Sequence, residues 1–171
     1  MMFYIYDENL NKIGTKKRKS VHFDGDWHKG IQLNIICGDE ILIQQRSHSV
    51  DIAKGCYDQS LAVQLIVEDG EDDLTALKRG LKEELGIENL KIKKVFGPVK
   101  IKKTYDYDSR LNNNEFITLY EARLKEKIII NPTSDKVSRI FWRNIEDVKK
   151  DCFKRPDSYT KTFSKWLMNV M

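Results

Sequence analysis

The sequence feature that most constrains the fold is a helical pattern between residues 72 and 86, with strand-like runs before and after it. Its apolar residues recur at spacings of three and four, the period of one α-helix face, at Leu74, Leu77, Leu81 and Leu85. Asp72 is a residue type that caps helix N-termini, and Gly86 stands where a left-handed C-terminal residue is needed. We therefore expect a helix from Asp72 to Gly86 whose leucines face the core.

Short apolar or alternating runs predict β-strands around this helix. They cover residues 3–7, 31–37, 41–43, 61–67, 90–96, 99–107, 116–122 and 138–142. Gly38-Asp39 predicts a hairpin turn, and Asn112-Asn113-Asn114 predicts another turn. Two further helices are expected near residues 145–150 and 158–170. This order of elements predicts an α/β or α+β fold with a mixed sheet.

The domain organisation follows from length and from the absence of dividing segments. A chain of 171 residues is the size of one domain and is long enough to bury a core without disulfides. No internal repeat, Pro-rich linker or low-complexity tract interrupts it. We expect a single domain over residues 1–171, with an N-terminal arm (1–29), a core (30–150) and a C-terminal helix (151–171).

Composition limits the compartment and the partners. The three cysteines are widely spaced without a CxxC pair, which argues against a disulfide framework or a zinc ribbon and indicates a reducing compartment. No segment approaches the ~18 apolar residues of a membrane span, and the N-terminus lacks the order of a secretory signal. We expect a cytoplasmic protein without a membrane partner. The formal charge of +4 suits an anionic small molecule without requiring nucleic acid, and the oligomeric state stays open.

Two adjacent carboxylates lie in the last turn of the predicted helix. Glu83 and Glu84 share a face with Gly80, because residues three and four apart are neighbours on a helix. The two charges repel each other and lie at the negative end of the helix dipole. A divalent cation such as Mg²⁺ would remove this conflict. An ordinary solvated acidic face explains the same pair, so both interpretations stand at this point.

The residues around the acidic pair resemble the Nudix box, which reads Gly, five residues, Glu, seven residues, Arg-Glu-apolar-x-Glu-Glu-x-Gly-apolar. The residues that match at the required spacing are Glu71, Arg79, Leu81, Glu83, Glu84, Gly86 and Ile87. The resemblance implies the Nudix fold, a mixed β-sheet sandwiched between helices. It also implies a Mg²⁺- or Mn²⁺-dependent hydrolase that cleaves a diphosphate bond in a nucleoside-diphosphate-linked or related small molecule. In it, Glu83 and Glu84 are metal ligands and catalytic residues, and Glu71 pairs with Arg79 to support the site.

The resemblance covers most of the chain and points to the branch that includes isopentenyl-diphosphate isomerases. The segments that carry it are 6–9, 25–28, 43–47, 57–60 and 141–148. It implies Glu115 as a third catalytic carboxylate or base, Arg46 as a phosphate contact and Gln64 as a substrate-binding residue at a position where this branch often has His. His22 and His28 are either metal ligands or hydrogen-bonded loop anchors.

Two departures from the box fall on important positions. Gly80 replaces the Glu that follows the box arginine, and the opening glycine is replaced by Leu65 or, allowing two extra loop residues, by Val63. A glycine inside a helix costs about 1 kcal/mol relative to alanine. Close approach of a substrate or of backbone would explain Gly80, and so would drift after loss of activity. Losing one carboxylate is expected to weaken metal binding.

These departures keep a second functional class open, a catalytically silent binding or sensor module with the Nudix fold. Isomerisation is disfavoured, because Ala62 occupies the position of the isomerase cysteine and Cys56 lies too early in the chain. A nucleic-acid surface is the remaining alternative. It would combine basic and aromatic residues on two consecutive strands, Lys91, Lys93, Lys94, Lys100, Lys102, Lys103, Tyr105 and Tyr107. The same alternation is typical of a half-exposed strand, which we favour.

Overall fold

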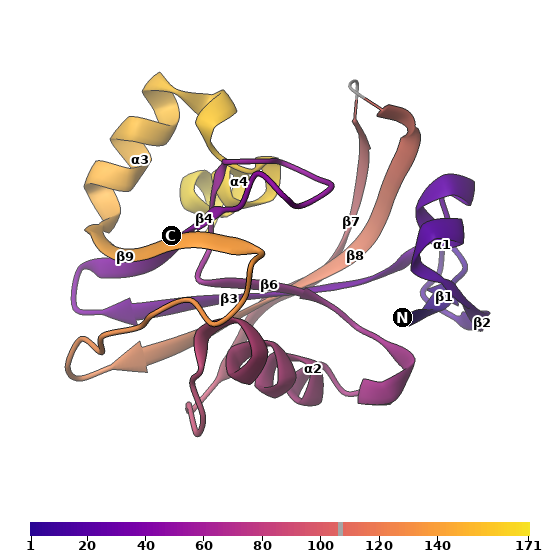
Figure 1. Cartoon of the computed structure of the whole chain (residues 1–171), viewed down its shortest axis with the longest axis horizontal. Helices are drawn as coiled ribbons and strands as arrows, with labels where there is room; N and C mark the ends of the chain where they lie inside the picture. The colour runs from indigo at the N-terminus through magenta and orange to yellow at the C-terminus, as the bar shows by residue number, and fades with distance from the viewer. Residues whose placement is uncertain (106–107) are drawn as a thin grey trace.

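The computed structural model describes residues 1–105 and 108–171 and contains a mixed β-sheet with helices on both sides (Figure 1). In the main sheet the strand order is β5-β4-β3-β8-β7, with β6 paired to β3 and β9 paired to β4. Its strands are β3 (His28–Cys37), β4 (Glu40–Arg46), β5 (Tyr57–Asp58), β6 (Leu61–Gln64), β7 (Lys93–Tyr105), β8 (Asp108–Leu124) and β9 (Val137–Asn144). The pair β3–β8 is parallel and the other pairs are antiparallel, so the predicted mixed-sheet class is confirmed.

The hairpin β3–β4 forms where the sequence predicts it. Cys37 pairs with Glu40, which leaves Gly38-Asp39 as a two-residue turn. Gly38 has φ 60°, the left-handed conformation that such a turn requires. Strand β3 continues into the centre of the sheet, where β4 and β8 flank it and most of its residues are buried. Because β3 is central, its residues form one side of the candidate site.

The predicted helix from Asp72 to Gly86 is present but changes its winding. An α-helix, α2 (Asp73–Gly80), continues into a π-helical turn, η2 (Leu81–Leu85), which ends at Gly86 with φ 65°. The Asp72 side chain accepts hydrogen bonds from the first turn of α2, as expected of a cap. Three of the predicted leucines are buried, whereas Leu74 is 39% exposed and Ala76 faces the core in its place. Single π turns inside α-helices are frequent at functional sites, and this one carries both box glutamates.

The strands after the helix differ from the prediction. One long strand, β7, replaces the two expected at 90–96 and 99–107, with register shifts near Gly97-Pro98. The asparagines expected to form a turn lie inside β8, where Asn113 pairs with Lys103. Tertiary contacts explain this, because the Nδ2 of Asn114 donates a hydrogen bond to the Gly25 carbonyl at 2.6 Å. Residue 107, the end of the predicted strand, lies outside the described residues.

The N-terminal arm contains the strand predicted at residues 3–7, together with a second strand and a helix that the sequence did not predict. Strands β1 (Met2–Tyr6) and β2 (Lys12–Lys17) pair antiparallel, and α1 (Arg18–Asp24) follows at the basic stretch. Phe3 and Val21 form a small core with Ile66. Packing of α1 against β1 and β8 brings the arm onto the main sheet.

Two C-terminal helices form close to the predicted ranges. Helix α3 (Ile145–Lys154) is capped by Asn144, a 3-10 turn η3 (Pro156–Ser158) follows, and α4 (Lys161–Asn169) is capped by Thr160. Phe163 and Trp166 anchor α4 in the core. In Figure 1 these helices lie on the side of the sheet opposite α2. None of the helices in the described part of the chain has the length and apolar character needed to cross a membrane.

Candidate functional site

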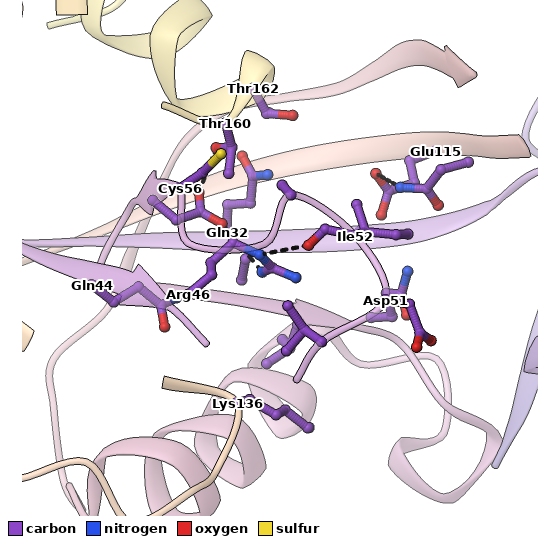
Figure 2. Close-up of a pocket in the computed structure, with 18 of the residues that line it drawn as sticks. Gln32, Gln44, Arg46, Asp51, Ile52, Cys56, Glu115, Lys136, Thr160 and Thr162 are labelled. Carbon is purple, nitrogen blue, oxygen red and sulfur yellow. Dashed lines mark hydrogen bonds and ion pairs between the residues drawn. The ribbon is translucent and has the colours of Figure 1, made fainter. Parts of the chain in front are cut away.

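A cavity of about 570 Å³ lies between β3, β4, β6, the 47–56 loop and the N-terminus of α4. Five of the sequence-predicted site residues line it, namely Arg46, Gln64, Arg79, Glu84 and Glu115. Figure 2 shows Arg46 near its centre, with Thr162 on one side and Lys136 on the other. Glu83 and Glu71 are absent from the described lining.

The two adjacent box glutamates have different surroundings. Glu84 is 6% exposed, and its Oε1 lies 3.2 Å from the Nζ of Lys136. Burial raises the pKa of Glu84, while Lys136 opposes that shift. The side chain of Glu83 is 55% exposed and contacts the Nη1 of Arg79 at 3.4 Å. Only one of the two predicted ligands therefore faces the cavity.

The predicted Arg79–Glu71 ion pair is wrong, because Arg79 pairs with Asp69 instead. The Nε and Nη2 of Arg79 donate to the two carboxylate oxygens of Asp69 at 2.7 and 2.8 Å. A 3-10 turn, η1 (Val67–Asp69), folds Asp69 toward the helix, whereas Glu71 pairs with Lys12 at the surface at 2.9 Å. Nη2 of Arg79 also donates to the Gln64 carbonyl at 3.1 Å. Arg79 thus connects α2 to β6, with Asp69 rather than Glu71 as its carboxylate partner.

The two departures from the box are sterically coupled. A Cβ added at Gly80 would lie 2.4 Å from Cγ1 of Val63 and 3.2 Å from Cδ2 of Leu61. Carbon atoms do not approach to 2.4 Å without a shift of one partner, so any side chain at position 80 collides with β6. The close approach that explains Gly80 is that of the Val63 side chain. Val63 is also the residue that replaces the opening glycine in the shifted count.

At the other end of the cavity, Glu115 on β8 is 6% exposed and hydrogen-bonded. Its Oε2 accepts from Nδ2 of Asn113 at 2.8 Å and lies 3.4 Å from Nζ of Lys103. Burial alone would raise the pKa of Glu115, but Lys103 and the other partners hold it below its usual value. Gly30 makes room for this carboxylate, because a Cβ there would lie 2.7 Å from Oε1 of Glu115.

The arm residue His28 lies next to this carboxylate, with its Nε2 3.9 Å from Oε1 of Glu115, and the His22 ring lies beside His28 with the ring centroids 5.1 Å apart. Burial lowers the pKa of His28 and lowers the pKa of His22 to about 4, so both rings are neutral at pH 7. Nδ1 of His28 lies 3.1 Å from the Asp26 carbonyl and therefore carries the proton. Its Nε2 then accepts from Nε2 of Gln64, at 3.3 Å. These contacts describe hydrogen-bonded anchors, one of the two interpretations that the sequence left open.

Arg46 is held in place by two contacts. Its Nε donates to the Ile52 carbonyl at 3.1 Å, and its Nη1 lies 3.4 Å from Asp58. Asp58 is buried and accepts a hydrogen bond from Oγ1 of Thr160 at 2.7 Å. Burial raises the pKa of Asp58, and Arg46 counteracts this. The guanidinium remains in the cavity lining, as its predicted contact with substrate requires.

Several lining residues were missed by the sequence, most importantly Lys103 and Lys136. Lys103 looked like part of an exposed basic strand, yet its side chain is only 12% exposed. Lys100 and Lys102 instead place their Nζ atoms over the Trp27 ring, each at 5.5 Å from its centroid. These contacts leave Lys103 largely unavailable to the alternative nucleic-acid surface and place Lys100 and Lys102 against an aromatic ring of the protein itself. Tyr107, another residue of that predicted surface, lies outside the described residues.

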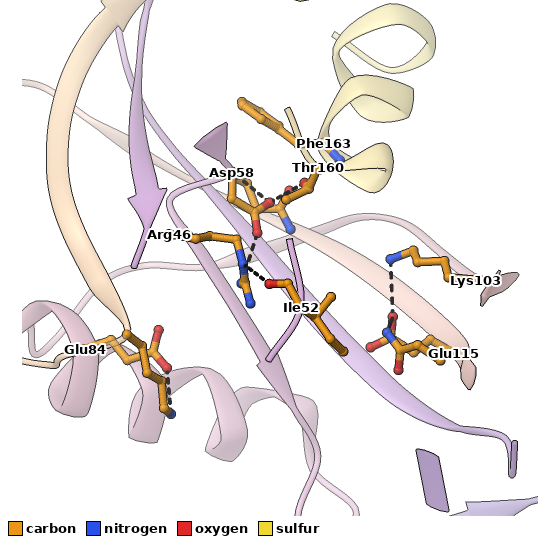
Figure 3. Close-up of polar contacts among 11 residues, drawn as sticks. Arg46, Ile52, Asp58, Glu84, Lys103, Glu115, Thr160 and Phe163 are labelled. Carbon is orange, nitrogen blue, oxygen red and sulfur yellow. Dashed lines mark hydrogen bonds and ion pairs between the residues drawn. The ribbon is translucent and has the colours of Figure 1, made fainter. Parts of the chain in front are cut away.

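The expected three-carboxylate centre is not assembled. Figure 3 shows Glu84 and Glu115 on opposite sides of Arg46. Across residues 1–105 and 108–171, no three His, Cys, Asp or Glu side chains are grouped as metal ligands. Glu84 does fit one Mg²⁺ ion that takes water and substrate phosphates as its other ligands, the usual way this ion is bound. Because the Lys136 side chain is about half exposed, at 52%, it can turn away from Glu84 when such an ion binds.

Comparison with known proteins places this geometry in a family. The family model described as NUDIX domain matches residues 29–163. A relative named Nudix hydrolase 3, from Arabidopsis thaliana, is 27% identical over 165 residues, and this chain spans only 21% of its length while 92% of this chain is matched. An isopentenyl-diphosphate Delta-isomerase from Roseobacter denitrificans is 23% identical over 144 residues, 84% of this chain and 79% of the isomerase.

Solved structures share the fold at low sequence identity. A crystal structure from Deinococcus radiodurans superposes with a TM-score of 0.75 at 17% identity, covering 98% of this chain and 97% of that one. The Escherichia coli dihydroneopterin triphosphate pyrophosphohydrolase gives a TM-score of 0.58 at 17% identity, with 84% and 96% covered. At this identity the likeness supports the architecture and leaves the substrate to the site itself.

Proposed function

Since the chain belongs to the NUDIX domain family, we propose that it is a cytoplasmic hydrolase that cleaves a diphosphate bond in a nucleoside-diphosphate-linked or related small molecule, with Mg²⁺ or Mn²⁺. The observation that carries the proposal is the cationic end of the cavity around Glu84. A buried carboxylate there faces a cavity that Arg46, Arg79 and Lys136 also line. This combination offers an oxygen ligand for a metal ion beside positive charge for phosphate oxygens.

Each residue at this end has a separate task in the proposal. Glu84 would hold the ion, with Glu83 as a second ligand. The chemistry that such an ion would supply is neutralisation of charge on the diphosphate and activation of a water. Arg46 and Lys136 contact phosphate oxygens, and Arg79 positions the helix end through Asp69. Glu115 faces the substrate from the far end, so we assign it to substrate contact rather than to metal binding.

The second candidate is a binding module that holds a diphosphate ligand without turnover. It is favoured by one feature, the Val63 side chain, which fills the space where a side chain at position 80 would supply a third carboxylate. Isomerase activity is not proposed although relatives carry that name. Ala62 lines the cavity at the position where the resemblance requires a cysteine, and burial raises the pKa of the nearby Cys56 thiol, which disfavours its nucleophilic form.

The test is a product-release screen over nucleoside diphosphate derivatives with Mg²⁺ and with Mn²⁺. Glu84→Gln is expected to lower kcat/KM by at least roughly 100-fold, since a buried ligand is lost. Glu83→Gln is the matched control on the exposed neighbour and is expected to lose less. Binding of a diphosphate derivative without any metal-dependent product release would establish the binding module instead.

A further inference from the structure

A second cavity, of about 140 Å³, lies beside the end of α4 and is lined by β3, β7, β8 and the residues that follow α4. It lies on the same face of the sheet as the cavity described above, the main cavity. Residues two apart on a strand share a face, and Asn34 of the second cavity comes two residues after Gln32 of the main cavity. The two cavities are therefore neighbours along β3.

Trp166 of α4 lies between the two cavities. Its Nε1 donates a hydrogen bond to Oε1 of Gln32, on the side of the main cavity. It also belongs to one hydrophobic cluster with Leu119 and Val170, which line the second cavity. Because Trp166 is 1% exposed and held at its Nε1, it separates the second cavity from the main one.

The second cavity contains a buried acceptor atom without a partner. Asn34 is 2% exposed, and its Oδ1 has no hydrogen-bond partner among the described residues. Its Nδ2 donates to Sδ of Met171 at 3.5 Å, so a flipped amide would lose that bond and bring two acceptors together. Most buried polar atoms in folded proteins are satisfied. Oδ1 of Asn34 therefore requires a hydrogen-bond donor that the described part of the protein does not supply.

The charged residues of the lining pair with each other. Nε of Arg123 donates to Oε1 of Glu121 at 2.6 Å, and Nη2 of Arg123 lies 3.3 Å from Oε2. The Arg123 side chain is 67% exposed, so this ion pair marks the solvent side of the cavity. Burying a further charge without its own partner would be costly. A neutral ligand is thus favoured over an ammonium or a carboxylate.

The rest of the lining is mainly apolar, and the cavity is small. Leu119 is buried in one wall, and Val95 and Val170 add methyl groups. A water molecule at Asn34 would meet few polar partners there, whereas buried waters typically make about three hydrogen bonds. An engineered cavity of roughly 150 Å³ holds benzene, so a benzene-sized ring is of the right volume for this cavity.

We propose that the second cavity is a binding site for a small neutral alcohol or phenol. The ligand hydroxyl donates to Oδ1 of Asn34, and the hydrocarbon part lies against Leu119, Val95 and Val170. This ligand is distinct from the diphosphate substrate, and the inference does not depend on the function proposed for the main cavity.

The test is a nuclear magnetic resonance titration of the full chain, labelled with ¹³C in the methyl groups of its methionines. The probes are phenol, cyclohexanol and benzene. Met171 lines the second cavity and Met1 lines the main cavity, so their methyl signals report on the two sites separately. Phenol and cyclohexanol are expected to shift the Met171 signal and to leave that of Met1 unchanged. A shift of Met1 alone, or no shift with any probe, overturns the inference, and the latter result means that the cavity holds water only.

The affinities of the probes test the hydrogen bond to Asn34. Phenol is expected to bind about three- to tenfold more tightly than benzene, which corresponds to the net contribution of one hydrogen bond. Benzene has the same ring without the donor and is therefore the matched control. Equal or tighter binding of benzene contradicts the inference, whatever the variants below show.

A near-isosteric variant locates the contact. Asn34→Leu removes the unpaired acceptor and is expected to abolish the preference for phenol over benzene. It is also expected to keep or raise Tm, because a buried polar atom without a partner destabilises the folded state. Asn9→Leu, at an exposed position in the turn between β1 and β2, is the matched control and should keep the preference. A preference for phenol that survives in Asn34→Leu overturns the inference.

Discussion

Each end of the main cavity contains a buried carboxylate beside a lysine, but the pKa values of the two carboxylates are shifted in opposite directions. The Nζ to carboxylate distances are similar, 3.2 Å for Lys136–Glu84 and 3.4 Å for Lys103–Glu115. Nevertheless the pKa of Glu84 is raised by burial, whereas Lys103 and further donors lower that of Glu115 against its burial. The difference lies in the surroundings, because Lys136 is half exposed and Lys103 is almost fully buried.

This contrast indicates two roles. Among the described residues, the cation hydrogen-bonded to Glu84 is Lys136, whose half-exposed side chain can be exchanged for a metal ion, while Arg46 and Arg79 lie farther away. Glu115 is fixed by Asn113 and Lys103, and is suited to orient a substrate group rather than to exchange partners. Two ion pairs of similar length can thus differ in function. One carboxylate can exchange its lysine for a metal ion, and the other is held in a fixed position.

The largest expected effect on stability comes from removing the two lysines in turn. Lys103→Met leaves the buried Glu115 without its cation and is expected to lower the free energy of unfolding by about 3 kcal/mol. Lys136→Met removes a half-exposed partner and is expected to cost about 1 kcal/mol or less. Urea denaturation at pH 7 measures both values. Equal costs would show that the two ion pairs do not differ in rigidity.

A smaller effect on the free energy of unfolding is expected at the contact between Gly80 and Val63. This contact leaves Glu84 as the carboxylate that faces the cavity at its end. Gly80→Ala places a Cβ against Val63 and is expected to destabilise the chain by about 1–3 kcal/mol despite the higher helix propensity of alanine. In a Val63→Ala background the clash is relieved, so the same substitution should be neutral or stabilising. Denaturation of the two single variants and the double variant gives this coupling, and an unchanged effect in both backgrounds would contradict it.

The smallest expected effect is the pH dependence of the stability that each carboxylate contributes. At pH 7 the two contributions should have opposite signs. Glu115 has a lowered pKa, so its contribution to stability is present above the unfolded pKa of about 4.3 and is lost as the pH falls through the folded value. Glu84 has a raised pKa, so folding favours its neutral form and its contribution is lost as the pH rises through the folded value.

Two amide variants measure this difference. At pH 7, Glu115→Gln is expected to be less stable than the parent chain, whereas Glu84→Gln is expected to be as stable or more stable. Near pH 4 the effect of Glu84→Gln should vanish, because the parent Glu84 takes up its proton above its ordinary pKa, whereas the effect of Glu115→Gln should shrink only as the pH falls further through the lowered pKa of Glu115. Denaturation at the two pH values decides, and a loss of stability of the same size in both variants at pH 7 would refute the assigned shifts.

The sequence predicted the features that depend on local chemistry. The Gly38-Asp39 turn and the start and end of the helix at Asp72 and Gly86 are set by residues whose conformational preferences act within a few positions. The mixed-sheet class followed from the order of elements. Arg46 and Glu84, which the sequence assigns to the site, both line the cavity.

The features that depend on distant contacts were not predictable in this way. The fixed spacing of the box suggested Glu71 as the partner of Arg79, but a 3-10 turn brings Asp69 there. Lysine in an alternating strand looked exposed, but the Lys103 side chain is only 12% exposed because its ammonium lies beside Glu115 on the neighbouring strand. The meaning of Gly80 emerged only with the position of the Val63 side chain beside it.

The central claim is that a metal ion binds at the Glu84 end and not at the Glu115 end. Mn²⁺ binding, measured by electron paramagnetic resonance in the presence of inorganic diphosphate, tests it directly. Glu84→Gln should weaken Mn²⁺ binding by at least roughly tenfold, and Glu115→Gln should leave it nearly unchanged. If Glu115→Gln abolished Mn²⁺ binding while Glu84→Gln retained it, the roles of the two ends would be reversed.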